Sequence, residues 1–388
     1  MIKLNNFSLF VASCYLFFLV FNILYYSAFT GEWSYYSYEN NFSIDNNYQP
    51  DSIFYYVLNG DTYKAYYPHF LELISQGLHM LPNWSHAIAY IYYFVWWIFR
   101  FEVSDVFLIA FFINNIAIVI SYLYFVKIGR EIIGLKMRWR GLYFLNPTLI
   151  YISQMMSKEA FLIALLTALC YYSIKRKYMI IFIFSSITVF VRAPFALLGG
   201  LPIFLKGKDV RIYRLLFLTI LFYLVIGYFY SNVVQNTNSI KILGNAGITR
   251  LAFEWNYFYL GPLMMAPFKL IGNFYDLVRH AFFYSIQQGR IDLYHVTTIP
   301  ITIALLAQYK TLFYIGLNPF KVLRGANGHV LLFIIGFGIL LSANQYVHSR
   351  YLWPILPLFV LLLIGIKKTR LKKNSMLIKK TAHNTIET

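Results

Sequence analysis

The sequence predicts an all-α, polytopic membrane protein with about ten transmembrane helices, forming a single integral membrane domain (1–388). Three observations predict this class: the composition, a succession of apolar runs, and the division of charges between the loops. Of the 388 residues, 59% are hydrophobic and 12% are charged, and the mean hydropathy is +0.58. A chain of this composition has too little polar surface to cover a soluble globule. Lipid is therefore expected to solvate most of it.

The apolar runs define the expected spans. The first run, 8–29, is close to the roughly 20 helical residues that cross a hydrocarbon core. It is aromatic to its end and no small-residue cleavage site follows, so it is expected to remain as an anchor. Several later runs are short, which predicts tilted or broken helices, and Asn146-Pro147 is expected to break or kink one of them. The further expected spans are 105–126, 141–156, 159–174, 178–192, 193–206, 213–231, 292–309, 328–344 and 351–366.

The orientation depends on the apolar stretch 87–99, which is too short to span and carries the typical interface residues Trp96 and Trp97. If this stretch is a surface helix, 23 of the 33 Lys and Arg fall on the side of the N-terminus. If it spans instead, every later loop changes side and the bias reverses. The positive-inside rule favours the surface helix, with both termini and the basic tail 367–388 in the cytoplasm.

The net charge of +18 does not indicate a nucleic-acid-binding protein, because the basic residues form short clusters of the kind that anchor helices at the inner leaflet. The inner loops are short and contain no P-loop, which argues against a nucleotide-driven machine. Cys14 and Cys170 both fall inside expected spans, so no disulfide framework is predicted. No His or Cys spacing resembles a metal site, and no cofactor is expected.

Two polar segments fall on the outer side, 30–104 and 232–291, and function is expected there. All acids except Glu131, Asp209 and Glu387 lie on this side. The second segment contains the apolar patch GPLMMAPFKLIGNF, where Pro262 and Pro267 are expected to interrupt any spanning helix. That patch is predicted to be re-entrant or to lie in the interface.

Asp61 is the first candidate for chemistry, because a carboxylate near the membrane and among aromatic rings can hold an acceptor hydroxyl and take its proton. Its neighbour Tyr63 is one of several outer aromatic residues that can stack on a sugar ring. The alternative is that Asp61 simply caps the helix that begins there.

Glu159 is the second candidate. It lies at the outer tip between two closely spaced spans, where a carboxylate left in lipid costs about 2.5 kcal/mol or more. Either its side chain points into a protein cavity and is functional, or it is a helix-start residue that snorkels to the interface beside Lys158.

Arg192 and Arg350 are expected at the outer boundary, where the positive-inside rule disfavours arginine. A phosphate counter-charge explains their position, because guanidinium binds phosphate oxygens in a bidentate manner. The alternatives are structural ion pairs with outer acids or exposed, snorkelling side chains. A possible outer cationic set is completed by His348, Arg250, Lys269, Arg279 and Arg290.

The order of these features resembles the GT-C class of polyprenyl-dependent membrane glycosyltransferases. The resemblance rests on an outer-loop acid in D-x-Y form at Asp61, on N-P-x-x-x-x-x-S from Asn146 followed by Glu159, and on the closing H-S-R-Y-L-W-P-I-L-P around Arg350. Among bacterial families, the length, the number of spans and the large second outer loop look most like O-antigen or capsule repeat-unit polymerases of the Wzy type.

This resemblance implies a glycan donor on undecaprenyl pyrophosphate, transferred at the periplasmic face of the bacterial inner membrane. Asp61 would activate the acceptor, Glu159 would support it, and the outer arginines would hold pyrophosphate. A flippase and a chain-length regulator are the implied protein partners. In many GT-C enzymes a second acid follows the first, whereas Thr62 follows Asp61 here. The use of a divalent metal is therefore left open.

Other functions are compatible with the same residues. A GT-C enzyme that transfers a single sugar from a polyprenyl phosphate has the same requirements. A transporter or flippase for lipid-linked sugars is disfavoured by the placement of the candidate charges at one boundary rather than near the bilayer midplane. A noncatalytic scaffold is opposed by the concentration of acids on the outer side.

Overall fold

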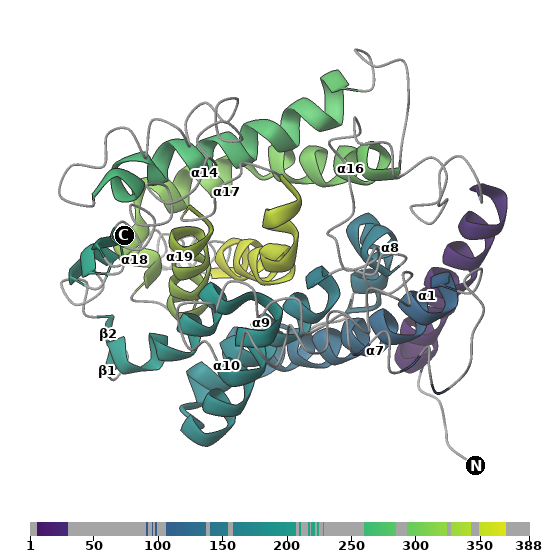
Figure 1. Ribbon diagram of the computed structural model, residues 1–388, viewed down its shortest axis with the longest axis horizontal. Coiled ribbons are helices and arrows are strands. Elements are labelled where there is room, and N and C mark those ends of the chain that lie inside the picture. Colours follow the sequence, from purple (N-terminus) through teal and green to yellow (C-terminus); the bar gives the residue numbers. More distant parts are fainter. Residues whose placement is uncertain are drawn as a thin grey trace, which may run out of the picture.

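The protein is almost entirely helical in the computed structural model, as the sequence predicts (Figure 1). A hairpin of two-residue strands, β1 (Leu205–Lys206) and β2 (Asp209–Val210), is the exception among the described residues. The structure describes residues 6–29, 106–136, 140–153, 158–206, 209–210, 260–284, 293–323, 327–342 and 349–369, with isolated positions in 91–98 and 216–228. The predicted surface helix 87–99 therefore lies outside the described residues apart from isolated positions.

The first half of the bundle is built on four helical segments that match predicted spans closely. They are α1 (Asn6–Phe29), α7 (Val106–Lys127), which continues as the π-helix η4 (Ile128–Ile132), the pair η5 (Arg140–Leu145) and α8 (Pro147–Ser153), and α9 (Lys158–Lys175). The 3₁₀ helix η5 ends one residue before Asn146 and α8 starts at Pro147. The predicted break at Asn146-Pro147 is thus confirmed, since proline is tolerated in the first turn of a helix but not in its interior.

Helix α9 is the centre of the molecule. Every residue from Leu162 to Cys170 is buried, and α9 contacts α7, α8, α10, α19 and η9 (Figure 1). Its sequence is apolar on all sides in this stretch, which is the pattern of a helix surrounded by protein. The start of α9 is therefore held in place by several other helices.

Helix α10 (Tyr178–Arg192) is followed by the 3₁₀ helix η6 (Ala193–Phe204), which folds back along it. The close packing of the two helices shows the reversal: a Cβ at Gly199 of η6 would overlap the Ser185 Oγ and approach Ile181, both in α10. The predicted spans 178–192 and 193–206 are consequently the two arms of one helical hairpin. Its tip is at Arg192, and α10 has only 15 residues.

The second half of the described chain covers another side of the bundle. In Figure 1, α14 runs along one long edge of the molecule, with α16 and α17 beside it, while α7 runs along the opposite edge. The helices are α14 (Gly261–Arg279), the π-helix η8 (His280–Tyr284), α16 (Leu293–Ala307), α17 (Tyr309–Leu317), α18 (Pro319–Leu323), α19 (Gly328–Ser342) and η9 (Ser349–Ile355), which continues as an α-helix over 356–369.

The interruption predicted at Pro262 and Pro267 is wrong, because α14 is continuous through both prolines. Pro262 lies in the first turn, where the missing N–H would have no helical partner. Pro267 lies in the interior and removes one backbone hydrogen bond. Packing of the opposite face, where Asn273 and Leu277 are buried, offsets this loss.

The structure does not support ten full-length spans. Among the described residues, Phe111–Ile132 and Leu352–Thr369 are long and apolar enough to cross a membrane. A third crossing is obtained if Thr298–Ala307 and Tyr309–Leu317, which meet at 61°, count as one span. Other predicted spans form short helices, such as the 15 residues of α19 and the 12 residues of η6.

Candidate active site at the start of helix α9

Glu159 lies in the first turn of α9 and is 2% exposed, with both carboxylate oxygens buried. Its side chain is therefore turned into the protein and does not snorkel to the surface. Because the backbone N–H groups of a helix N-terminus carry a partial positive charge, this is a favourable place for a carboxylate. Burial excludes water from its oxygens, and electrostatic interactions there are stronger than in solution.

The depth of Glu159 follows from the pairing of α7 with α9. Ser121 of α7 donates to the Ile163 carbonyl at 3.5 Å, and one turn later the Tyr124 hydroxyl donates to the Tyr172 hydroxyl at 3.0 Å. The two helices are therefore parallel. Glu159, about one turn before Ile163, lies level with the residues of α7 one turn before Ser121.

Buried polar side chains at this end of the bundle tie three helices together. Asn114 of α7 donates through Nδ2 to the carbonyls of Ile152, at 3.0 Å, and Ser153, at 3.3 Å, in the last turn of α8. The Ser153 hydroxyl in turn donates to Oδ1 of Asn22 in α1 at 2.7 Å. Asn22, Asn114 and Ser153, here called the asparagine–serine cluster, are all buried. The cluster fixes the end of α8 at Ser153, six residues before Glu159.

Sequence reasoning missed the asparagine–serine cluster. The available signal is the occurrence of asparagine inside two apolar runs, since polar side chains within a membrane span point to the protein interior and find partners there. A second buried group lies deeper, where the hydroxyls of Tyr143 and Thr167 donate to the Ser121 Oγ at 2.8 and 3.2 Å.

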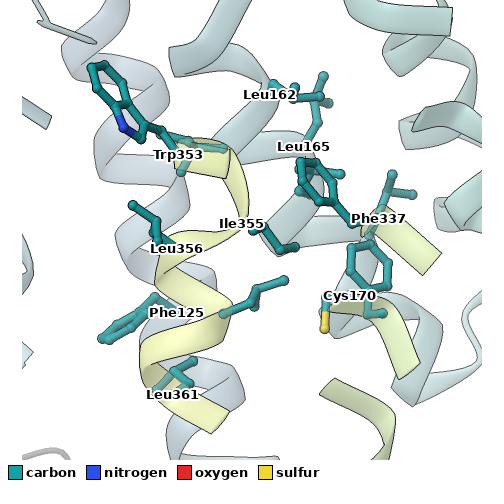
Figure 2. Packing of buried hydrophobic residues seen from close by; sticks show 14 of the residues in the cluster. Phe125, Leu162, Leu165, Cys170, Phe337, Trp353, Ile355, Leu356 and Leu361 are labelled. Carbon is teal, nitrogen blue, oxygen red and sulfur yellow. The ribbon is translucent and has the colours of Figure 1, made fainter. Parts of the chain in front are cut away.

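Arg350 lies in η9, which packs against α9 and α14. Figure 2 shows Trp353 of η9 at the same end as Leu162 of α9, and Leu361 toward the other end. Helix α9 and the last helix thus run in the same direction. Arg350, one 3₁₀ turn before Trp353, is consequently placed at the end of the bundle where α9 begins.

Arg192 lies at the tip of the α10–η6 hairpin and is partly buried. Its guanidinium carbon lies 5.6 Å from the centroid of the Phe195 ring, which stacks on Phe337 of α19 at 4.7 Å. Because α10 is antiparallel to α9 and Phe184 stacks on Tyr172, Arg192 is about five residues, or about 7 Å, deeper in the bundle than Glu159.

The remaining candidate residues are less closely tied to Glu159. Arg279 is exposed in the last turn of α14 and makes no ion pair with a described residue, and Lys269 lies in the middle of the same helix. The catalytic candidate Asp61 and the binding candidates Tyr63, Arg250, Arg290 and His348 lie outside the described residues. In the described ranges, no three His, Cys, Asp or Glu side chains are close enough to hold a metal ion.

Comparison with known proteins adds no relative: no family model, no curated protein and no solved structure matches this chain.

Proposed function

We propose that this protein is a membrane glycosyltransferase that joins undecaprenyl-pyrophosphate-linked oligosaccharide repeat units at the periplasmic face of the bacterial inner membrane, as an O-antigen or capsule polymerase does. The order of short motifs along the chain supports this, as does the helical architecture. The observation that carries most weight is the burial of Glu159 in the first turn of α9, at the same end of the bundle as Arg350.

The proposed reaction breaks the bond between the donor sugar C1 and the pyrophosphate oxygen and forms a bond from C1 to an acceptor hydroxyl oxygen. Asp61 takes the hydroxyl proton, and the lipid keeps the pyrophosphate. The guanidinium groups of Arg350 and Arg192 stabilise the negative charge on the leaving oxygen. Glu159 supports the site as a fixed negative charge from which water is excluded.

The test is an assay of purified protein with a polyprenyl-pyrophosphate-linked oligosaccharide. The expected product is a ladder of joined repeat units, and Asp61→Asn should abolish it while the protein level persists. Wild-type chain lengths in that variant would remove Asp61 from the mechanism. The absence of any new glycosidic bond with the wild-type protein would contradict the proposal itself.

A single-sugar transferase of the same class is distinguished in cells. Deletion of a polymerase leaves surface glycans that carry one repeat unit, whereas deletion of a monomer transferase leaves a truncated unit.

A transporter or flippase for lipid-linked sugars is the second candidate, and interrupted helices favour it. Such breaks occur at Asn146 and between α16 and α17, which meet at 61°. Secondary transporters bind substrates at helix breaks of this kind. Movement of a labelled lipid-linked sugar across proteoliposomes without bond formation would support transport over transfer.

A further inference from the structure

The end of the bundle opposite Glu159 brings together three segments that are far apart in the sequence. Lys175, in the last turn of α9, forms an ion pair with Glu131 of η4, at 2.8 Å between Nζ and Oε2. The Tyr171 hydroxyl donates to the same carboxylate at 2.9 Å. Lys368 of the last helix donates to the carbonyl of Gly134, which follows η4. These contacts join the ends of three helices into one surface.

This surface, here called the basic end, carries many cations, and the acid Glu131 lies among them. Because Lys175 already pairs with that acid, Lys127 and Arg130 have no ion pair with any residue that the structure describes. The exposed cations of the basic end are Lys127, Arg130, Lys136, Lys175, Arg176, Lys177, Lys367 and Lys368. The charges of Lys127 and Arg130 are thus available to an external anion.

Tyrosine rings hold two of these lysines in place without neutralising them. The Lys127 Nζ lies 5.3 Å from the centroid of the Tyr124 ring and 5.6 Å from that of Tyr171. Lys175 lies 5.7 Å from the Tyr171 ring on the same platform. Since a cation–π contact leaves the positive charge intact, the Lys127 ammonium is positioned for a phosphate. Lys175 lies beside it and keeps N–H donors beyond the one it gives to Glu131.

The turn between α9 and α10 adds a cation at an unfavourable backbone position. Arg176 has a φ of 54°, and the N–H groups of Arg176 and Lys177 donate to the carbonyls of Ser173 and Tyr172, at 3.2 and 3.1 Å. This is the helix-ending motif in which glycine is preferred at the left-handed residue. An arginine at this position keeps its charge at the basic end despite the backbone cost.

An apolar stripe on α7 leads directly to Lys127. Phe112, Ile116, Ile120 and Leu123 are all exposed and recur at helical spacing, and Lys127 continues the same face one turn later. A lipid acyl chain fits along such a stripe while its headgroup lies beside the lysine. A soluble anion would contact the lysine but not the apolar stripe. The occupant that fits both the stripe and the lysine is a phospholipid.

We propose that the basic end binds the phosphate of an anionic phospholipid, with Lys127 and Lys175 holding the headgroup over the Tyr171 ring and the acyl chain following the stripe on α7. The proposal is independent of the glycosyltransferase reaction, because it concerns the opposite end of the bundle.

The experiment compares the full-length protein in nanodiscs of phosphatidylcholine alone and of phosphatidylcholine with phosphatidylglycerol. The wild-type protein should gain several degrees in Tm from phosphatidylglycerol, and native mass spectrometry should show retained phosphatidylglycerol. K127Q/K175Q should lose at least half of that gain. K310Q is the matched control, since Lys310 also lies over a tyrosine ring, that of Tyr309 at 5.7 Å, but on α17.

Glu131→Gln separates lipid binding from simple loss of the ion pair. It removes the acid that pairs with Lys175, so phosphatidylglycerol retention should rise even if Tm in phosphatidylcholine falls. Equal gains in wild type and K127Q/K175Q would overturn the proposal, as would unchanged retention in Glu131→Gln. Inorganic phosphate or glycerol phosphate that reproduces the whole Tm gain in phosphatidylcholine nanodiscs would also overturn it, by showing that a soluble anion suffices.

Discussion

Glu159 occupies a position at which a charged side chain is costly unless the surrounding protein compensates it. A carboxylate that is 2% exposed loses nearly all of its hydration, which costs free energy. The helix dipole at the first turn of α9 offsets part of this desolvation cost. A residue needed only to start a helix would not have to be buried. The burial therefore favours a role for the carboxylate in the proposed site.

Glu159→Gln is expected to lower the rate of sugar transfer on the order of 10-fold to 100-fold, because it keeps the size of the side chain and removes the charge. The initial rate in the purified assay is the measurement, with the protein level as a check on folding. Glu387→Gln, in the C-terminal tail, is the matched control and should retain the wild-type rate. A normal rate in Glu159→Gln would assign Glu159 a purely structural role.

Arg350→Ala and Arg350→Lys test whether the guanidinium holds pyrophosphate. Lysine restores the charge but not the planar fork that binds two phosphate oxygens. Both variants should therefore raise the KM for the donor, with the lysine variant between alanine and wild type. Lys321→Ala, on the exposed side of α18, serves as control. Equal KM values in all four proteins would show that Arg350 does not contact the donor.

Single residues also show why only part of the candidate site follows from the sequence. The sequence identifies Glu159 as a charge between two apolar runs and Arg350 as a cation on the outer side, and the structure places both at one end of parallel segments. The asparagine–serine cluster could not be predicted, because the pairing of Asn22 with Ser153 depends on which faces of α1 and α8 meet. Hydropathy carries no information on that pairing.

The α10–η6 hairpin depends on the absence of a side chain at Gly199. Gly199→Ala should lower the free energy of unfolding by about 1–3 kcal/mol, because the new Cβ forces Ser185 or Ile181 to move. Gly200→Ala is a closely matched control, since a Cβ at Gly200 has no atom within 4 Å. Thermal or denaturant unfolding in detergent is the measurement.

Adding Ser185→Ala to Gly199→Ala should recover part of this loss, because the atom that the new Cβ would overlap is the serine hydroxyl. Identical stability of the Gly199 and Gly200 variants would contradict the hairpin packing.

The hydrogen bond between Asn22 and Ser153 is expected to couple α1 to α8. A double-mutant cycle of Asn22→Ala and Ser153→Ala should give a coupling energy of about 0.6–1.7 kcal/mol, the range found for hydrogen bonds between membrane helices. The coupling energy is obtained by measuring the free energy of unfolding of the wild type, both single variants and the double variant. Additive single losses would mean that the 2.7 Å contact contributes nothing of its own.

Helix boundaries were predictable from the sequence, whereas the type of helix was not. The expected span 178–192 coincides with α10, and 159–174 differs from α9 by one residue at each end, because apolar runs and their charged ends define both. The expected spans 178–192 and 193–206 meet at Arg192, and η6 returns along α10 from there, as two consecutive spans do. Apolarity alone did not predict that the returning arm is a 3₁₀ helix.

The described contacts place the first half of α1 and the end of the last helix at one end of the molecule. A Cβ at Gly141 would meet Phe10 and Cys14 of α1, and Lys368 contacts Gly134, a few residues before Gly141. The contact between Lys368 and Gly134 is part of the basic end, so α1 begins near that end too. Since clusters of Lys and Arg flanking apolar helices remain on the cytoplasmic side, both termini are expected there.

Reporter fusions test this arrangement for the whole chain. Green fluorescent protein fused to either terminus should fluoresce, because it folds in the cytoplasm and not after export through the general secretory route. Lys136→Cys, at the basic end, should react with a thiol reagent only after the membrane is permeabilised, whereas Asn46→Cys in the segment 30–104 should react in intact spheroplasts. A fluorescent fusion at one terminus alone would require an odd number of crossings. The outer segments would then divide between the two sides, and Asp61 could not reach the end of the bundle that carries Glu159 and Arg350.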